Sequence, residues 1–215
     1  MKLNFDVTQY DLFIVDFDGT VVDTMEMWRH ICPNFILSMN KTPEEDIYLK
    51  ITSKTNIEIA YYVRDEYFPE YSREEIVELF FEFIKGEYAK QNIKPNATLL
   101  LEELNKHGKV VLYSATASKV LNVLLDKFDL RKYFEGIYSG SDLGLTKRDG
   151  SGYLEVAKMC KGDNILVLED ALHAIIGARS KNLDVLAILD YSNRYLIEKV
   201  KEYATYILDL DEYKE

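Results

Sequence analysis

The sequence predicts an α/β protein: a Rossmann-like core, in which helices cover both faces of a parallel sheet, together with a small all-helical domain. Two observations predict the core. Short apolar runs typical of buried strands recur along the chain, and segments with helical spacing separate the later runs. Strands that alternate with helices in this way form parallel sheets covered on both faces. A third observation, a long stretch without a strand-like run, predicts the helical domain.

The first expected strand is the apolar run at residues 11–16, which ends in acidic residues and a tight turn. The later strands are further apolar runs, expected at residues 109–114, 164–169, 184–188 and 206–208. The core helices are segments with helical spacing, expected at residues 98–107, 118–128 and 152–161. This alternation is typical of a sheet whose strands run in the same direction.

Residues 22–95 carry aromatic and charged side chains at helical spacing and no convincing strand-like run. Three prolines mark the expected helix breaks: Pro43, Pro69 and Pro95. Thr42 and Ser72 are placed to cap the helices that follow. We therefore predict an α/β core domain of residues 1–21 and 96–215, and a helical cap domain of residues 22–95 packed by its aromatic residues.

The 215 residues include 37 acidic and 26 basic side chains, which gives a formal net charge of -11. An acidic protein repels nucleic acid and anionic lipid at long range, so we expect neither nucleic acid nor a membrane as a partner. Cys32 and Cys160 are too few and too far apart for a disulfide framework or a zinc site. No run approaches the roughly 18 apolar residues that span a bilayer. We expect a cytoplasmic protein that is a monomer or a weak homodimer.

Asp16 and Asp18 follow the first expected strand, two residues apart. Alternate residues of an extended chain point the same way, so both carboxylates can face one site beyond the carboxyl end of the strand. One carboxylate can attack phosphorus, and the other can protonate the leaving oxygen and later deprotonate water. Gly19 permits a sharp exit and lets backbone amides approach an anion. Taken alone, the pattern also fits a strand that simply ends in a turn.

Polar residues also follow other expected strands. Ser114 could hydrogen-bond a phosphoryl oxygen, and Lys147 could neutralise both a nucleophile and a transferring phosphoryl group. Glu169 and Asp170 are adjacent acids after an apolar run, and burying them beside the first two aspartates would be costly without a cation. Magnesium prefers such oxygen ligands and bridges to phosphate, so we expect Mg2+ as the cofactor.

Four clusters of polar residues, in this order, resemble the four motifs of the haloacid dehalogenase superfamily: Asp16 with Asp18, then Ser114, then Lys147, then Glu169 with Asp170. The first motif, which reads Asp-Phe-Asp-Gly-Thr, is the most specific, and the resemblance extends over essentially the whole chain. A helical insertion after the first strand looks like the cap of the subfamily that contains phosphoglycolate phosphatases and beta-phosphoglucomutases.

The resemblance implies a role for each position. Asp16 would be the nucleophile and Asp18 the general acid and base. Ser114 would be the phosphoryl-oxygen ligand and Lys147 the electrostatic clamp. The metal ligands would be Asp16, Asp170 and the backbone carbonyl of Asp18, with Glu169 as an additional acid. Substrate contacts are expected at Gly19, Thr20, Ala115, Thr116 and, in the cap, Lys54.

The cap segment at residues 49–56 occupies the place of a substrate-specificity loop in similar proteins. Thr52, Ser53 and Asn56 could hydrogen-bond a polar substrate, and Lys54 aligns roughly with a cap arginine that relatives use for a remote phosphate or carboxylate. Lysine is a point charge rather than a planar fork, so it would orient a substrate more loosely. An ordinary polar helix junction is an equally open interpretation of this segment.

The chain departs from the family pattern at four positions. Arg148 follows the clamp lysine where relatives usually have proline, which leaves the register of that loop less fixed. Ala171 and Ala174 replace a serine and a glycine, and the first change deletes a hydroxyl near the metal. Trp28 stands where beta-phosphoglucomutases tend to carry histidine, which favours a hydrolase over a mutase.

We therefore expect a magnesium-dependent phosphatase that hydrolyses a small phosphorylated metabolite through an aspartyl phosphate. A phosphomutase of the beta-phosphoglucomutase type is the closest alternative. An alternative of another class is a weakly catalytic regulatory or binding protein on the same fold, which the departures at Arg148, Ala171 and Ala174 favour. Dehalogenation is disfavoured because it needs neither Asp18 nor magnesium.

Overall fold

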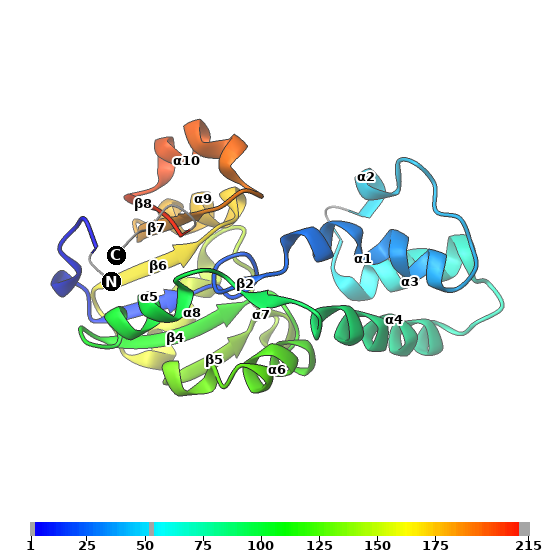
Figure 1. Ribbon diagram of the computed structural model, residues 1–215, viewed down its shortest axis with the longest axis horizontal. Coiled ribbons are helices and arrows are strands. Elements are labelled where there is room, and N and C mark those ends of the chain that lie inside the picture. The colour runs from blue at the N-terminus through cyan, green and yellow to red at the C-terminus, as the bar shows by residue number, and fades with distance from the viewer. Residues whose placement is uncertain (1–2, 52–53, 211–215) are drawn as a thin grey trace. The chain divides into compact units, whose positions relative to one another are not determined.

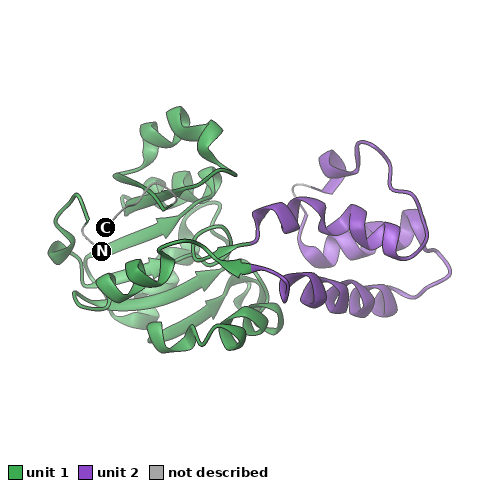
Figure 2. Ribbon diagram, viewed as in Figure 1, with its two compact units in different colours: residues 1–23, 92–215 green, residues 24–91 purple. Residues whose placement is uncertain are grey.

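The computed structural model describes residues 3–51 and 54–210 (Figure 1). Contacts within the chain divide it into two compact units, one of residues 1–23 and 92–215 and one of residues 24–91 (Figure 2). The first unit contains a large sheet with helices, and the regular elements described in the second unit are helices.

The first unit is built on a six-stranded parallel sheet. Across the sheet, the strands are β5 (Gly136–Ser139), β4 (Lys109–Ser114), β1 (Leu12–Val15), β6 (Ile165–Glu169), β7 (Asp184–Leu189) and β8 (Tyr206–Asp209). Val15, at the end of β1, pairs with Leu112 of β4 on one side and with Leu168 of β6 on the other. The carboxyl ends of three strands therefore lie side by side, where ligands bind in open α/β sheets.

Helices cover both faces of this sheet, so the predicted α/β fold class is confirmed. The helices are α5 (Ala97–Leu104), α6 (Ser118–Lys127), α7 (Gly140–Leu143), α8 (Ser151–Cys160), α9 (Leu172–Ser180) and α10 (Ile197–Tyr203). On one face, Leu12 and Ile14 share a buried cluster with Val156 of α8 and Ile175 of α9. Phe13 alternates with them, so it points to the opposite face, where it is also fully buried.

Two short strands lie at the border between the units. β2 (Val22–Asp23) pairs antiparallel with β3 (Asn92–Ile93), and the Lys94 amide continues the pairing by donating to the Val21 carbonyl at 2.9 Å. The sequence pattern predicts no strand within residues 22–95. Strands of two residues are too short to show an alternation of apolar and polar side chains, so periodicity cannot reveal them.

The second unit consists of α1 (Met25–Ser38), α2 (Ile47–Ile51), α3 (Asn56–Tyr67) and α4 (Arg73–Tyr88). Aromatic side chains pack its interior, as expected. The ring centroid of Phe35 lies 5.0 Å from that of Phe80 and 6.4 Å from that of Phe68. No helix in the part of the chain that the structure describes has the length and apolar character needed to cross a membrane.

The predicted helix starts are correct at one of two positions. Ser72 caps α4, because its hydroxyl accepts from the Glu75 amide while the Glu75 carboxylate accepts from the Ser72 amide. The cap predicted at Thr42 is wrong, because the next helix begins only at Ile47. A proline near a threonine resembles a helix start locally, but here residues 41–44 form no helix.

Candidate active site

Three buried carboxylates meet at the carboxyl ends of β1 and β6. Asp16 directly follows β1, while Glu169 ends β6 and Asp170 follows it. One carboxylate oxygen from each of the three residues lies within 4.8 Å of the others. The parallel register produces this contact, and the Asp16 amide donates to the Leu168 carbonyl at 3.0 Å. Two segments about 150 positions apart in the chain are thereby brought to one point.

Lys147 is buried against two of these carboxylates. Its ammonium group forms an ion pair with Asp16 and lies 2.5 Å from Oε1 of Glu169. Burial lowers the pKa of Lys147, but the charges of Asp16 and Glu169 outweigh that effect and hold the pKa above its ordinary value. Lys147 is therefore a fixed positive charge within the acidic group.

The loop that carries Lys147 is packed closely against α9. Gly177 of α9 packs so closely that a Cβ atom there would lie 2.2 Å from the Lys147 carbonyl oxygen. Gly150 has a left-handed φ of 75°, and a Cβ there would lie 2.1 Å from the carbonyl oxygen of Gly177. Close packing between two glycines thus positions the loop, and Arg148 remains exposed beside it.

Two tyrosines that the sequence reasoning missed complete the surroundings of Lys147. The Tyr153 hydroxyl donates to Oε1 of Glu169 at 2.6 Å. The Lys147 ammonium lies 5.2 Å from the ring centroid of Tyr113 and 5.9 Å from that of Tyr153, within the range of cation–π attraction. Tyr113 comes just before Ser114 in β4. Because side chains alternate along a strand, the sequence could have predicted that Tyr113 points to the other face of the sheet from Ser114. The position of Tyr153 in its helix carries no comparable signal.

Asp18 is hydrogen-bonded by two hydroxyl groups: that of Ser114, the last residue of β4, and that of Thr116, two residues further on. Its Oδ2 accepts from the Thr116 hydroxyl at 2.7 Å and from the Ser114 hydroxyl at 3.4 Å. The Thr116 backbone amide donates to Ser114 Oγ at 3.0 Å, so the serine hydroxyl is tied to the main chain of Thr116. Asp18 is partly exposed, unlike Asp16, and so remains accessible to a ligand.

The remaining predicted contact residues of this unit lie in the loop after β1 and the loop after β4. Gly19 has a left-handed φ of 82° and makes the turn after β1. The Thr20 hydroxyl donates to Asp16 Oδ2 at 3.4 Å. Ala115 is exposed between two buried neighbours.

The three buried carboxylates of Asp16, Glu169 and Asp170 carry more negative charge than the single Lys147 ammonium among them can neutralise. Burial, reinforced by the charge of Glu169, raises the pKa of Asp16 well above its ordinary value and that of Asp170 to about 7. Lys147 opposes the shift of Asp16, and Lys94 followed by Lys147 opposes that of Asp170, without cancelling either shift. Three buried carboxylate donors around one buried ammonium therefore suit a small divalent cation, which prefers oxygen ligands.

Lys54 belongs to the other unit, in the exposed turn before α3, and its amide donates to the Ile51 carbonyl at 2.9 Å. Asn56 is the first residue of α3. The other two predicted specificity residues, Thr52 and Ser53, lie outside the described residues.

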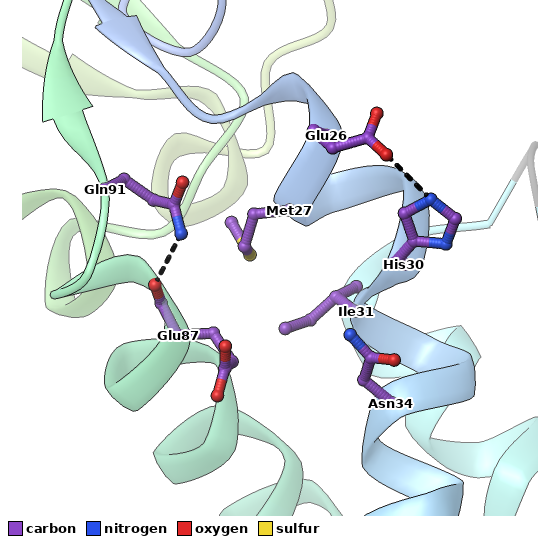
Figure 3. A pocket seen from close by; sticks show the side chains of 7 residues that line it. All are labelled: Glu26, Met27, His30, Ile31, Asn34, Glu87 and Gln91. Atoms are coloured by element: carbon purple, nitrogen blue, oxygen red, sulfur yellow. Dashed lines mark hydrogen bonds and ion pairs between the residues drawn. The ribbon is translucent and has the colours of Figure 1, made fainter.

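A pocket of about 290 Å³ lies within residues 24–91, between α1 and the end of α4 (Figure 3). Part of its polar lining is partnered: His30 lies 3.0 Å from Glu26, and the Gln91 side-chain amide donates to the Glu87 carbonyl at 2.9 Å. Lys54 is not among the residues that line it. The contact of His30 with Glu26, one helical turn away, thus accounts for its place in this pocket without a ligand.

Comparison with known proteins places the chain in one family. The family described as haloacid dehalogenase-like hydrolase matches residues 10–180. A bifunctional riboflavin kinase/FMN phosphatase of Arabidopsis thaliana is 23% identical over 179 residues, which cover 81% of this chain and 47% of that protein. The chain therefore spans about half the length of this curated relative.

Two solved structures show the same fold over nearly their whole length. A protein from Thermotoga maritima, provisionally named a beta-phosphoglucomutase, has a TM-score of 0.74 and 22% identity, with 94% of this chain and 95% of that chain covered. CbbY from Rhodobacter sphaeroides, solved in complex with phosphate, has a TM-score of 0.74 and 16% identity, with 94% and 96% covered.

The family match and the fold thus define a hydrolase-type α/β enzyme, and this chain carries a buried carboxylate group in it. The chain belongs to the haloacid dehalogenase-like hydrolase family.

Proposed function

We propose that the protein is a magnesium-dependent phosphatase that hydrolyses a small phosphorylated metabolite. The observation that carries this proposal is the buried group in which Lys147 contacts Asp16 and Glu169 beside Asp170. It offers a carboxylate for attack on phosphorus, a positive charge next to that carboxylate, and further carboxylates for a metal ion. Family membership and the FMN phosphatase among the relatives support the same conclusion.

In the proposed reaction, a carboxylate oxygen of Asp16 attacks phosphorus, the bond from phosphorus to the leaving alcohol breaks, and an aspartyl phosphate forms. Asp18 gives a proton to the leaving oxygen. It then takes a proton from the water that attacks phosphorus, the bond between phosphorus and the Asp16 oxygen breaks, and the products are the alcohol, inorganic phosphate and the free Asp16 carboxylate. The Thr116 hydroxyl orients Asp18 for both transfers. Ser114 and the backbone around Ala115 contact the phosphoryl oxygens.

Lys147 keeps the attacking carboxylate in place and offsets the charge of the phosphoryl group. Asp16, Asp170 and the backbone carbonyl of Asp18 would hold Mg2+, with Glu169 nearby. When bound, Mg2+ offsets the negative charge that the carboxylates and the phosphate ester bring together. The raised pKa of Asp16 supports the need for a cation, because a protonated carboxyl group is a poor nucleophile.

A phosphomutase would use the same residues and would return the phosphoryl group to another hydroxyl of the substrate. The name of the Thermotoga maritima neighbour keeps this alternative open. Trp28 favours the hydrolase, because an indole cannot serve in proton transfer and this side chain packs 6.0 Å from the Tyr88 ring inside its own unit.

The test is a screen of the purified protein against phosphorylated metabolites, including FMN, phosphoglycolate and sugar phosphates. Each sample is measured for inorganic phosphate and, by phosphorus NMR, for isomers of the ester. We expect phosphate release that requires Mg2+ and stops with a chelator. Isomer formation without phosphate release would identify a mutase. No turnover of any ester, with Mg2+ at millimolar concentration, would support the weakly catalytic alternative.

A further inference from the structure

A second buried ion pair lies in the first unit, outside the four motifs. Lys94 follows β3, Asp190 follows β7, and each side chain is only 2% exposed. Taking two charges out of water is costly, and an apolar pair of similar volume is often at least as stable. The stability of the fold therefore does not by itself explain a buried Lys–Asp pair at this place.

Asp190 begins a tight turn that is closed by its own side chain. Asp190 Oδ1 accepts from the Ser192 amide at 2.7 Å and from the Ser192 hydroxyl at 2.6 Å, while Oδ2 faces Lys94. The Asp190 amide donates to Oδ1 of Asn193 at 3.0 Å. Oδ1 is thus hydrogen-bonded within the turn, whereas the buried Oδ2 has no hydrogen bond among the described residues and faces only the Lys94 charge.

This turn holds the main chain of the metal-site aspartate. The Asn193 side-chain amide donates to the Asp170 carbonyl at 3.1 Å and to the Ile188 carbonyl at 2.9 Å. Asn193 is 7% exposed, so these bonds are shielded from water. A chain of contacts therefore runs from Lys94 through Asp190 and Asn193 to the backbone of Asp170.

The other side of Lys94 connects to the loop of the first motif. The Lys94 amide donates to the Val21 carbonyl at 2.9 Å, and the Gly19 amide donates to the Val22 carbonyl at 2.9 Å. Lys94 thus joins the turn after Asp18 to the turn that supports Asp170. The two aspartates follow different strands, and this chain of contacts connects the loops that carry them.

We propose that Lys94 and Asp190 form a positioning pair that holds Asp170 in place for metal binding. The proposal rests on the proposed function, because it takes Asp170 as a metal ligand. Lys94 touches neither substrate nor metal in this account. It acts on the position of Asp170 through the turn of residues 190–193, and its charge also opposes the rise in the pKa of Asp170. Residues that orient a metal ligand typically change metal affinity by about 10- to 100-fold when they are replaced.

The test is Mg2+ binding to the substrate-free protein by titration calorimetry, with thermal unfolding measured on the same samples. Lys94→Met is expected to weaken Mg2+ binding at least about tenfold. It also leaves Asp190 buried without its cation, so it is expected to lower the melting temperature. Asn193→Ala, which cuts the contact to Asp170 and keeps the ion pair, is expected to weaken Mg2+ binding as well.

The double variant Lys94→Met/Asp190→Asn separates positioning from stability. Removing both charges is expected to restore the melting temperature, while Mg2+ binding stays weakened because the lysine no longer fixes the turn. It also serves if Lys94→Met alone fails to fold. Arg179→Met is the matched control: Arg179 pairs with Asp184 at 3.1 Å at the start of β7, and its loss is expected to leave Mg2+ binding unchanged.

Recovery of both stability and Mg2+ affinity in the double variant would show a purely structural pair and overturn the inference. Unchanged Mg2+ binding in a folded Lys94→Met protein would overturn it too. A wild-type protein that binds no Mg2+ at millimolar concentration would instead contradict the proposed function, and the inference would fall with it.

Discussion

Tyr153 donates a 2.6 Å hydrogen bond to the same oxygen of Glu169 that lies 2.5 Å from the Lys147 ammonium. One carboxylate oxygen therefore receives both a hydroxyl and a cation in a buried site. Because hydrogen bonds to charged groups strengthen where water is excluded, Tyr153 is expected to fix Glu169 and, through it, Lys147.

Tyr153→Phe should lower kcat about tenfold, because it removes one hydrogen bond to a charged group and keeps the ring that packs near Lys147. Steady-state kinetics with the best ester measures the effect. The control is Tyr138→Phe, which removes the hydroxyl that accepts from Cys160 Sγ at 3.4 Å. Equal losses in the two variants would remove Tyr153 from the account.

Thr116→Val should slow esters with poor leaving groups more than activated esters. The threonine hydroxyl orients Asp18, and protonation by Asp18 matters most when the leaving oxygen is strongly basic. We expect a loss of about tenfold with an alkyl phosphate and a smaller loss with para-nitrophenyl phosphate. Comparable losses with both esters would contradict an acid–base role for Asp18. Thr205→Val, which removes a bond to Asp184 at the other end of the sheet, is the matched control.

Without metal, the protein should become less stable as the pH rises through the acidic range. The pKa of Asp170 is about 7 in the folded state against an ordinary value of 3.8, so between these values the folded protein binds a proton that the unfolded chain lacks. The contribution of Asp170 to the free energy of unfolding therefore falls from about pH 4 to about pH 7. Melting temperatures in chelator measure this slope.

Asp170→Asn should flatten this dependence, and the raised pKa of Asp16 should leave a residual slope. Saturating Mg2+ should flatten it in the wild-type protein, because a cation favours the ionised carboxylate. If Asp170→Asn keeps the full wild-type slope, Asp170 is not the group that titrates.

Lys54→Ala should raise KM about tenfold for an anionic substrate that reaches the helical unit. The same change should leave para-nitrophenyl phosphate nearly unaffected, because that ester is too small to need a remote contact. Lys41→Ala, another exposed lysine of residues 24–91, is the control. If Lys54→Ala has no effect on either substrate, Lys54 is an ordinary surface residue with no role in substrate binding.

The sequence predicts the strands at 12–15, 109–114, 165–169, 184–189 and 206–209 within one or two residues, because buried parallel strands are continuous apolar runs. It misses β5, since Gly136–Ser139 is short and only half apolar. The motif residues could be placed together because strand ends meet at one edge of a sheet.

Contacts that depend on tertiary packing could not be predicted from the sequence. Tyr153 and Lys94 carry no local pattern, because each acquires its partner from a segment far away in the chain. The same limit applies to Gly177, which supports the lysine loop from a different helix. Local pattern can identify strand ends and their polar residues, whereas the groups that orient those residues follow only from the folded chain.

The most direct test of the central claim is turnover by Asp16→Asn. The substitution keeps the size of the side chain and removes the negative charge that attacks phosphorus, so the rate with the best ester should fall to near background while circular dichroism and melting remain those of a folded protein. Asp163→Asn, at an exposed position, should retain full activity. An Asp16→Asn protein that hydrolyses the ester at close to the wild-type rate would contradict the proposed mechanism.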